Sequence, residues 1–217
     1  MIIRILIADD HQIVLDGLRL LLEAKEDIKV VGEAVNGREA VQKTRQLKPD
    51  IVIMDIAMSE LNGIEATRQI HELSPATRVI ILSMHATAEY INRALKAGAC
   101  GYLLKESTGI ELIDAVRTVY AGRRYMSQKI SDILIDDYVD HHAESVSDDP
   151  LESLSPRERE ILQLVAEGKS SAQIANIIFL SPKTVETYRS RLMQKLGIKN
   201  FPDLIKFAVQ KGLIPLE

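Results

Sequence analysis

Residues 5–10 of the chain read ILIADD, an apolar run that ends in two adjacent aspartates, Asp9 and Asp10. Such a run of aliphatic residues favours a strand that is covered on both faces. Two neighbouring carboxylates repel each other at neutral pH, so their position calls for a compensating positive charge. The stretch therefore predicts a buried strand with a binding function at its end.

Four further apolar runs follow, separated by stretches in which apolar residues recur three and four positions apart. That spacing is typical of one face of a helix. Strands that alternate with helices build a parallel sheet with helices on both faces. We therefore expect an α/β domain with a five-stranded parallel sheet, formed by residues 2–8, 28–34, 50–55, 78–83 and 100–104.

The character of the chain changes after residue 124. Residues 125–150 are expected to form a linker, helical in its first half and acidic in its second. The adjacent histidines His141 and His142 would point to different faces of a helix, so a solvated linker is favoured over a metal site. The domains are therefore predicted at 1–124 and 151–217, joined by that linker.

Residues 151–217 are expected to be all helical. Serine–proline pairs at 155–156 and 181–182 are helix start signals, and three glycines further on are helix stops. Ser155 and Glu158 also have the spacing of a capping box. These signals place four helices at 156–167, 171–178, 182–195 and 202–211.

Charge is divided unevenly between the two parts. Residues 1–150 carry 17 Lys and Arg against 24 Asp and Glu, a balance of −7. Residues 151–217 carry 10 against 7, a balance of +3. A basic domain suits a polyanionic partner such as nucleic acid.

The composition is that of a globular protein, and we expect it to be cytoplasmic. No apolar run approaches the ~18 residues that span a bilayer, so no membrane partner is expected. The first residues are not expected to form a signal peptide, because Arg4 interrupts a short apolar stretch. The single cysteine, Cys100, excludes an internal disulfide and fits a reducing compartment.

Polar side chains stand at the ends of four predicted strands: Asp9, Asp55, Ser83 and Lys105. The first strand of such a sheet lies beside the third, so these ends converge. Carboxylates suit Mg²⁺, and a hydroxyl and an ammonium beside them suit a phosphoryl group. The alternative is that the acids are helix caps, with Asp10 at the start of the following helix.

The motifs ILIADDH, PDIVIMDIAM, VIILSMH and AGACGYLLK resemble, in order and spacing, the receiver domain of bacterial two-component response regulators. The resemblance implies a flavodoxin-like (βα)5 fold and phosphorylation of Asp55 by a sensor histidine kinase. It implies that Mg²⁺ is held by Asp9, Asp10, Asp55 and the backbone carbonyl of Ala57. It also implies the phosphate-binding and switch residues Ser83, Lys105 and Tyr102, the last turning inward as Ser83 moves.

Two of the predicted helices, 171–178 and 182–195, follow each other closely, which is helix-turn-helix geometry. In the second, Val185, Leu192 and two further apolar residues share a face that should pack on the core. The opposite stripe carries short polar side chains and cations that can meet base edges and phosphates. The alternative is an ordinary solvated helix face.

The segments LSPREREILQLVAEGKSSAQIA (154–175) and LSPKTVETYRSRLMQKLGI (180–198) are similar to the LuxR-type DNA-binding domain. With the receiver, the whole chain resembles a response regulator of the NarL/FixJ type. The resemblance implies a transcription regulator that binds double-stranded operator DNA and forms a homodimer when phosphorylated or DNA-bound. It implies a recognition helix at 182–195, with Glu186, Thr187 and Ser190 as base readers and Lys183, Thr184, Arg189, Arg191 and Lys195 as phosphate contacts.

Two other functions are possible for such a sequence, a phosphatase and a DNA-binding protein whose receiver is silent. A phosphatase would use Asp55 as nucleophile and would need a second acid, but Ala57 stands where such enzymes carry an aspartate. A DNA-binding protein with a silent receiver would not be phosphorylated at Asp55. We expect no enzyme activity beyond the receiver's own phosphorylation and dephosphorylation.

Overall fold

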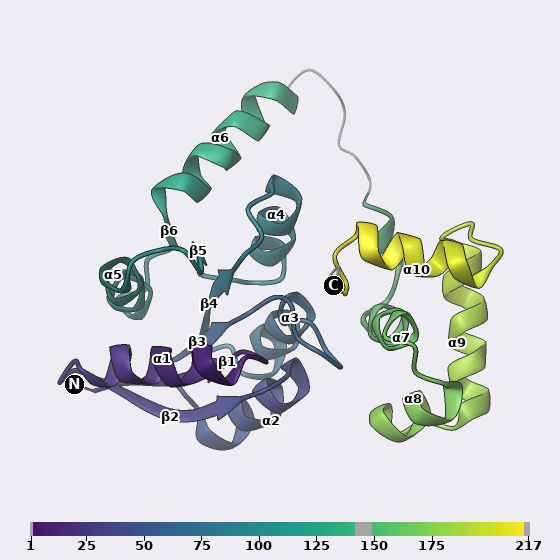
Figure 1. Cartoon of the computed structure of the whole chain (residues 1–217), viewed down its shortest axis with the longest axis horizontal. Coiled ribbons are helices and arrows are strands. Elements are labelled where there is room, and N and C mark those ends of the chain that lie inside the picture. Colours follow the sequence, from purple (N-terminus) through teal and green to yellow (C-terminus); the bar gives the residue numbers. More distant parts are fainter. Residues whose placement is uncertain (1, 142–148, 215–217) are drawn as a thin grey trace. The chain divides into compact units, whose positions relative to one another are not determined.

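The computed structural model describes residues 2–141 and 149–214, which divide into two compact units (Figure 1). The first unit contains the sheet and its helices, and the second contains the C-terminal helices. The prediction about His141 and His142 concerns side chains outside this description. Within the described ranges, no helix has the length and apolar character that a membrane crossing requires.

The first unit is built on a parallel sheet with strand order β2-β1-β3-β4-β5-β6. The five predicted strands are confirmed, but the prediction of five strands in all was one too few. The sixth, Tyr125–Met126, has only two residues, which pair with Gly101 and Tyr102 at the sheet edge. The strands are β1 (Ile3–Ala8), β2 (Ile28–Ala34), β3 (Ile51–Met54), β4 (Arg78–Ser83), β5 (Gly101–Leu104) and β6 (Tyr125–Met126).

Helices follow the strands, as the alternating pattern predicted. Two of them, α1 and α5, pack with residues such as Leu15 and Val116 on the sheet face formed by Ile5, Ile53 and their neighbours. The predicted helix of the linker is present as α6, and its Ile130 is fully buried. The helices are α1 (Gln12–Glu23), α2 (Gly37–Leu47), α3 (Gly63–Leu73), α4 (Ala88–Lys96), α5 (Gly109–Tyr120) and α6 (Gln128–His141).

Backbone hydrogen bonds hold the carboxyl ends of the central strands in line. The amide of Asp55 donates to the carbonyl of Ala8 at 2.8 Å, directly after β3 and β1 have paired. The amide of Lys105 donates to the carbonyl of Ser83 at 2.9 Å, directly after β5 and β4 have paired. The strand order and these bonds bring four polar residues to one edge of the sheet.

The second unit is all helical. Its core is a cluster of buried residues from each helix, including Ile161, Ile174, Val185 and Leu204. The start signals read from the sequence are confirmed, because the predicted capping box of Ser155 and Glu158 is formed and Ser181 accepts a hydrogen bond from the amide of Thr184. The helices are η1 (Pro150–Ser153), α7 (Pro156–Ala166), α8 (Ser171–Ile178), α9 (Pro182–Lys195) and α10 (Phe201–Gln210).

Candidate functional site

Lys105 joins two carboxylates at the carboxyl edge of the sheet. Its Nζ lies 2.6 Å from Oδ2 of Asp9 and 3.1 Å from Oδ2 of Asp55. Both acidic side chains are almost fully buried, at 2% and 3% exposed. The ammonium therefore supplies the positive charge that the acidic strand ends were predicted to need.

Burial and charge act against each other in this cluster. Burial raises the pKa of the Asp55 carboxyl, the charge of Asp9 raises it further, and Lys105 opposes both. Burial alone would lower the pKa of Lys105, but hydrogen bonding to Asp9 and the charge of Asp55 outweigh it and leave that pKa raised. The raised pKa favours the charged form of Lys105 beside the carboxylate that is predicted to carry the phosphoryl group.

Ser83 and Tyr102 meet the same short segment of backbone. The amide of His85 donates to Oγ of Ser83 at 3.1 Å, and the hydroxyl of Tyr102 donates to the carbonyl of His85 at 2.8 Å. The Tyr102 ring is fully buried, and burial raises the pKa of its hydroxyl, so it remains a donor. The Tyr102 side chain thus lies inside the fold in this structure, and its expected turn inward as Ser83 moves stays a prediction.

Two of the residues predicted to hold Mg²⁺, Asp9 and Asp10, lie in an acidic cluster after β1. Ligand atoms of Asp9, Asp10 and His11 lie within 4.8 Å of one another. Asp10 is 32% exposed, so the cluster opens to solvent on one side. Mg²⁺ binds through a few carboxylates and keeps several water molecules. An acidic cluster typical of a magnesium site is therefore present, and Ala57 lies half-buried on the loop that follows β3.

Gly63 lies directly against the backbone of Asp55, a contact that was not predicted from the sequence. A Cβ atom built on Gly63 would lie 1.8 Å from the carbonyl oxygen of Asp55. Its amide also donates to the carbonyl of Ile56 at 2.9 Å, which closes the loop behind Asp55. Only glycine permits this approach. In the sequence Gly63 stands in the stretch NGIEA (62–66), but its contact is with a residue eight positions earlier.

The C-terminal unit presents the polar face predicted for α9. Val185 and Leu192 are fully buried against the core, and Tyr188 and Leu196 pack on it, as predicted. The opposite face is exposed along the whole helix. It carries Lys183, Glu186, Thr187, Ser190, Arg191 and Gln194.

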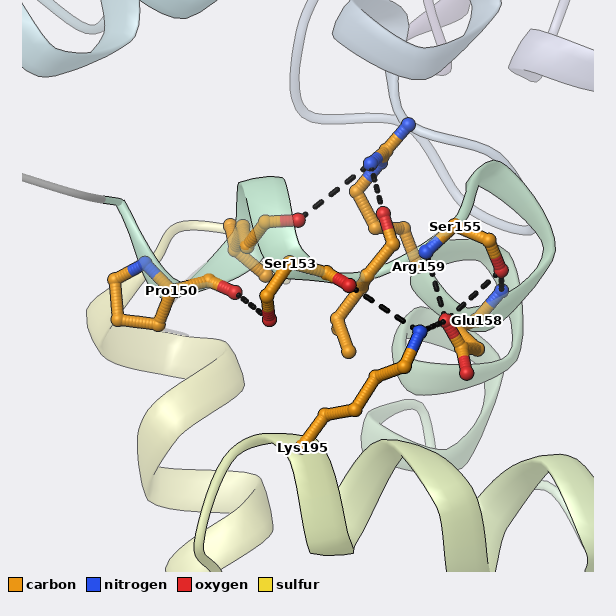
Figure 2. A network of polar contacts seen from close by, with 8 residues as sticks. Pro150, Ser153, Ser155, Glu158, Arg159 and Lys195 are labelled. Carbon is orange, nitrogen blue, oxygen red and sulfur yellow. Dashed lines mark hydrogen bonds and ion pairs between the residues drawn. The ribbon is translucent and has the colours of Figure 1, made fainter.

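Two of the cationic side chains predicted as phosphate contacts bond to other residues of the protein. Nη1 of Arg189 donates to Oγ of Ser171 at 3.2 Å, and the side chain is half-buried. Lys195 reaches from α9 to the start of α7, where its Nζ lies 2.7 Å from Oε2 of Glu158 and donates to the carbonyl of Ser153 at 3.2 Å (Figure 2). The role of Lys195 as a phosphate contact stays a prediction, and its position favours a structural role.

Glu158 is the centre of that network. Besides Lys195, its Oε2 accepts from the amide and the hydroxyl of Ser155 at 2.7 and 2.9 Å (Figure 2). Burial would raise the pKa of Glu158, but the hydrogen bonds from Lys195 and Ser155 outweigh it and hold that pKa below its ordinary value. The carboxylate therefore ties the first turn of α7 to the last turn of α9.

Comparison with protein families matches both units. Residues 5–117 match the response regulator receiver domain, and residues 152–208 match the bacterial regulatory proteins of the luxR family. The chain is a response regulator. It is a transcription regulator of the NarL/FixJ family that binds DNA through its LuxR-type helix-turn-helix, and it is not an enzyme, so the phosphatase alternative falls away.

Matches to individual relatives cover nearly the whole chain. The oxygen regulatory protein NreC of Staphylococcus haemolyticus is 42% identical over 214 residues, which are 97% of this chain and 99% of that protein. The solved structure of ChrA, the response regulator of a haem-sensing two-component system, is 35% identical with a TM-score of 0.54, over 98% of this chain and 99% of ChrA. RcsB of Salmonella typhimurium is 28% identical with a TM-score of 0.60, over 95% and 97% of the two chains.

Proposed function

We propose that this response regulator is switched by phosphorylation of Asp55 and, once phosphorylated, binds operator DNA through α9. A sensor histidine kinase would be the donor, and the regulator would act in the cytoplasm. The observation that carries the proposal is the ammonium of Lys105 between Asp9 and Asp55, at 2.6 and 3.1 Å. A cation placed this way can stabilise the charge of a transferred phosphoryl group.

The chemistry follows from the residues around Asp55. One carboxylate oxygen of Asp55 attacks the phosphorus of the kinase's phosphohistidine, the P–N bond breaks, and the imidazole nitrogen takes a proton from solvent. Lys105 would pair with the phosphoryl oxygens, and the Ser83 hydroxyl would donate to one of them. Bound Mg²⁺, held by Asp9, Asp10, Asp55 and the carbonyl of Ala57, would neutralise charge on the phosphoryl group and orient it.

The switch is proposed to control access to DNA. Phosphorylation adds a charge of about −1.5 to −2 beside Ser83 and Lys105, which biases the backbone shared by Ser83, His85 and Tyr102. The unphosphorylated receiver would either mask the recognition helix or prevent dimerisation. Solved structures of RcsB include dimers bound to DNA, which supports the proposal that this chain also acts as a homodimer.

Genome-wide DNA binding tests both halves of the proposal at once. Purified wild type and Asp55→Ala protein are treated with acetyl phosphate and Mg²⁺, mixed with fragments of the genome that encodes the chain, and the bound fragments are sequenced. We expect the wild type to enrich a set of related sites and Asp55→Ala to enrich the same sites several-fold less. Equal enrichment by the two proteins would mean that the receiver is silent.

The exposed face of α9 carries side chains suited to two roles, contacts with bases and contacts with phosphates. We propose that Glu186, Thr187 and Ser190 read base edges, because their side chains lie on the exposed stripe. Lys183 and Arg191 flank that stripe and are proposed to contact phosphates, together with Thr184 and Arg189. Phosphate contacts fix the position of the helix, and base contacts select the sequence.

Removal of Lys183 is expected to weaken binding to every DNA sequence. Each phosphate contact contributes about 0.9 to the slope of log affinity against log salt concentration, so Lys183→Ala should reduce that slope by about 0.9. The measurement is fluorescence anisotropy of random-sequence duplex DNA over a range of NaCl concentrations. Thr187→Ala serves as the matched control on the same face and should leave the slope unchanged. A wild-type slope in Lys183→Ala would remove this residue from the phosphate contacts.

A further inference from the structure

An aromatic ring on α10 lies against a cation of the recognition helix. The guanidinium carbon of Arg189 is 5.7 Å from the ring centroid of Phe201, the first residue of α10. The same guanidinium donates from Nη1 to the hydroxyl of Ser171, the first residue of α8. Three helices therefore meet at one positively charged group.

Phe201 is placed differently from the residues that build the core. α10 contributes Leu204 and Ala208 to the core, and both are fully buried. The Phe201 side chain is 44% exposed. An aromatic ring that is nearly half exposed contributes little to the packing of the hydrophobic core. The contact with Arg189 is therefore the main interaction that the Phe201 ring makes available.

The two contacts of Arg189 use different parts of the guanidinium. Attraction to an aromatic ring acts through the flat face of the group. A guanidinium has five N–H donors on its edge, and one of them is used by Ser171. The remaining donors form the planar fork that matches the oxygens of a phosphate group.

Arg189 lies at the edge of the α9 face that is proposed to meet DNA. It is half-buried at the side of α9, between the core face of Val185 and Leu192 and the exposed stripe that contains Glu186 and Ser190. A long arginine side chain loses considerable rotamer freedom when it binds, and a side chain already held in place loses less. A ring beneath the guanidinium would therefore strengthen phosphate binding without touching the DNA itself.

We infer that Phe201 is a positioning residue for DNA binding, whose ring holds the Arg189 guanidinium ready for a backbone phosphate. The inference rests on the proposed role of the α9 face and adds α10 to the DNA-binding apparatus. It makes the aromatic face, rather than apolar volume alone, the required property at position 201.

The test compares Phe201→Leu and Phe201→Tyr in the full chain. Affinity for random-sequence duplex DNA is measured by anisotropy across a range of NaCl concentrations. Phe201→Leu keeps an apolar side chain and loses the ring, so affinity at low salt should fall about 2- to 5-fold, the range of an exposed cation–π contact. Phe201→Tyr keeps an aromatic face and should stay within about twofold of the wild type.

A double-variant cycle separates positioning from folding. Arg189→Ala should reduce the salt slope by about 0.9. Phe201→Leu added to Arg189→Ala should change neither affinity nor slope, because the ring then has no guanidinium to hold. Equal losses from Phe201→Leu with and without Arg189, or wild-type affinity in Phe201→Leu, would overturn the inference.

Lys183→Ala in the same assay reports separately on the proposed function. A reduced slope for Lys183→Ala together with wild-type behaviour of Phe201→Leu rejects the inference and keeps the proposed DNA face. Circular dichroism melting of each variant confirms that helix content is retained. Surface substitutions of this kind shift the melting temperature by about 4 °C or less.

Discussion

Replacement of Asp55 by asparagine is expected to abolish phosphorylation of the chain by acetyl phosphate in the presence of Mg²⁺. The side chain keeps its size, but the amide cannot serve as the nucleophile that attacks phosphorus while acetate leaves. Intact-protein mass spectrometry of the treated chain should find one added phosphoryl group in the wild type and none in Asp55→Asn. Chelation of Mg²⁺ should suppress the wild-type modification to the same level.

Two further variants test whether the loss is specific. Asp114→Asn removes an exposed aspartate of α5 and should be modified like the wild type. Lys105→Ala keeps the nucleophile but removes the ammonium between Asp9 and Asp55, so it should be modified more slowly. Persistent modification of Asp55→Asn would place the phosphoryl group on another residue and withdraw the proposed role of Asp55.

Much of the fold could be predicted because its signals are local. Each main strand is a short run of buried aliphatic residues, and the structure has them within one or two residues of the predicted bounds. The helix starts of the second unit were readable because Ser155 and Ser181 cap their helices through bonds to residues three positions on. The strand β6 was missed because two residues carry no periodicity, and their pairing with β5 is a contact across the fold.

In the candidate site, too, some features could be predicted from the sequence and others could not. Asp9, Asp55, Ser83 and Lys105 could be grouped from sequence because parallel strands bring their carboxyl ends together. The approach of Gly63 to the Asp55 carbonyl could not be predicted, since it depends on the path of a loop. For α9, helical periodicity separated the buried face from the exposed one. It could not say that Lys195 would reach a carboxylate 37 residues earlier in the chain.

Loss of Lys195 is expected to destabilise the DNA-binding unit rather than to weaken phosphate contacts. Its ammonium is 2.7 Å from Glu158, whose side chain is only 4% exposed. Removing one partner of a buried pair leaves an uncompensated charge, but Lys195 itself is 43% exposed and partly screened. We therefore expect Lys195→Met to lower the free energy of unfolding of this unit by about 2 kcal/mol.

Hydrogen exchange resolved by mass spectrometry can measure this effect in the full chain. Peptides from α7 and α9 should lose protection in Lys195→Met, whereas peptides from the receiver should not. Lys199→Met removes an exposed lysine of the same unit and should leave protection unchanged. The double variant Glu158→Gln with Lys195→Met should recover part of the loss, because the carboxylate charge is removed with its partner.

The loss of stability in Lys195→Met is expected to depend on pH. The pKa of Glu158 is lowered in the folded state, so its contribution to stability is present above the ordinary value of 4.5 and is lost as pH falls through the folded-state pKa. Without Lys195, only the hydrogen bonds from Ser155 oppose the effect of burial, so the ionised carboxylate of Glu158 is stabilised less. The stability difference between wild type and Lys195→Met should therefore be largest near neutral pH and shrink in acid. A constant difference across this range, combined with a salt slope reduced by about 0.9, would instead make Lys195 a phosphate contact.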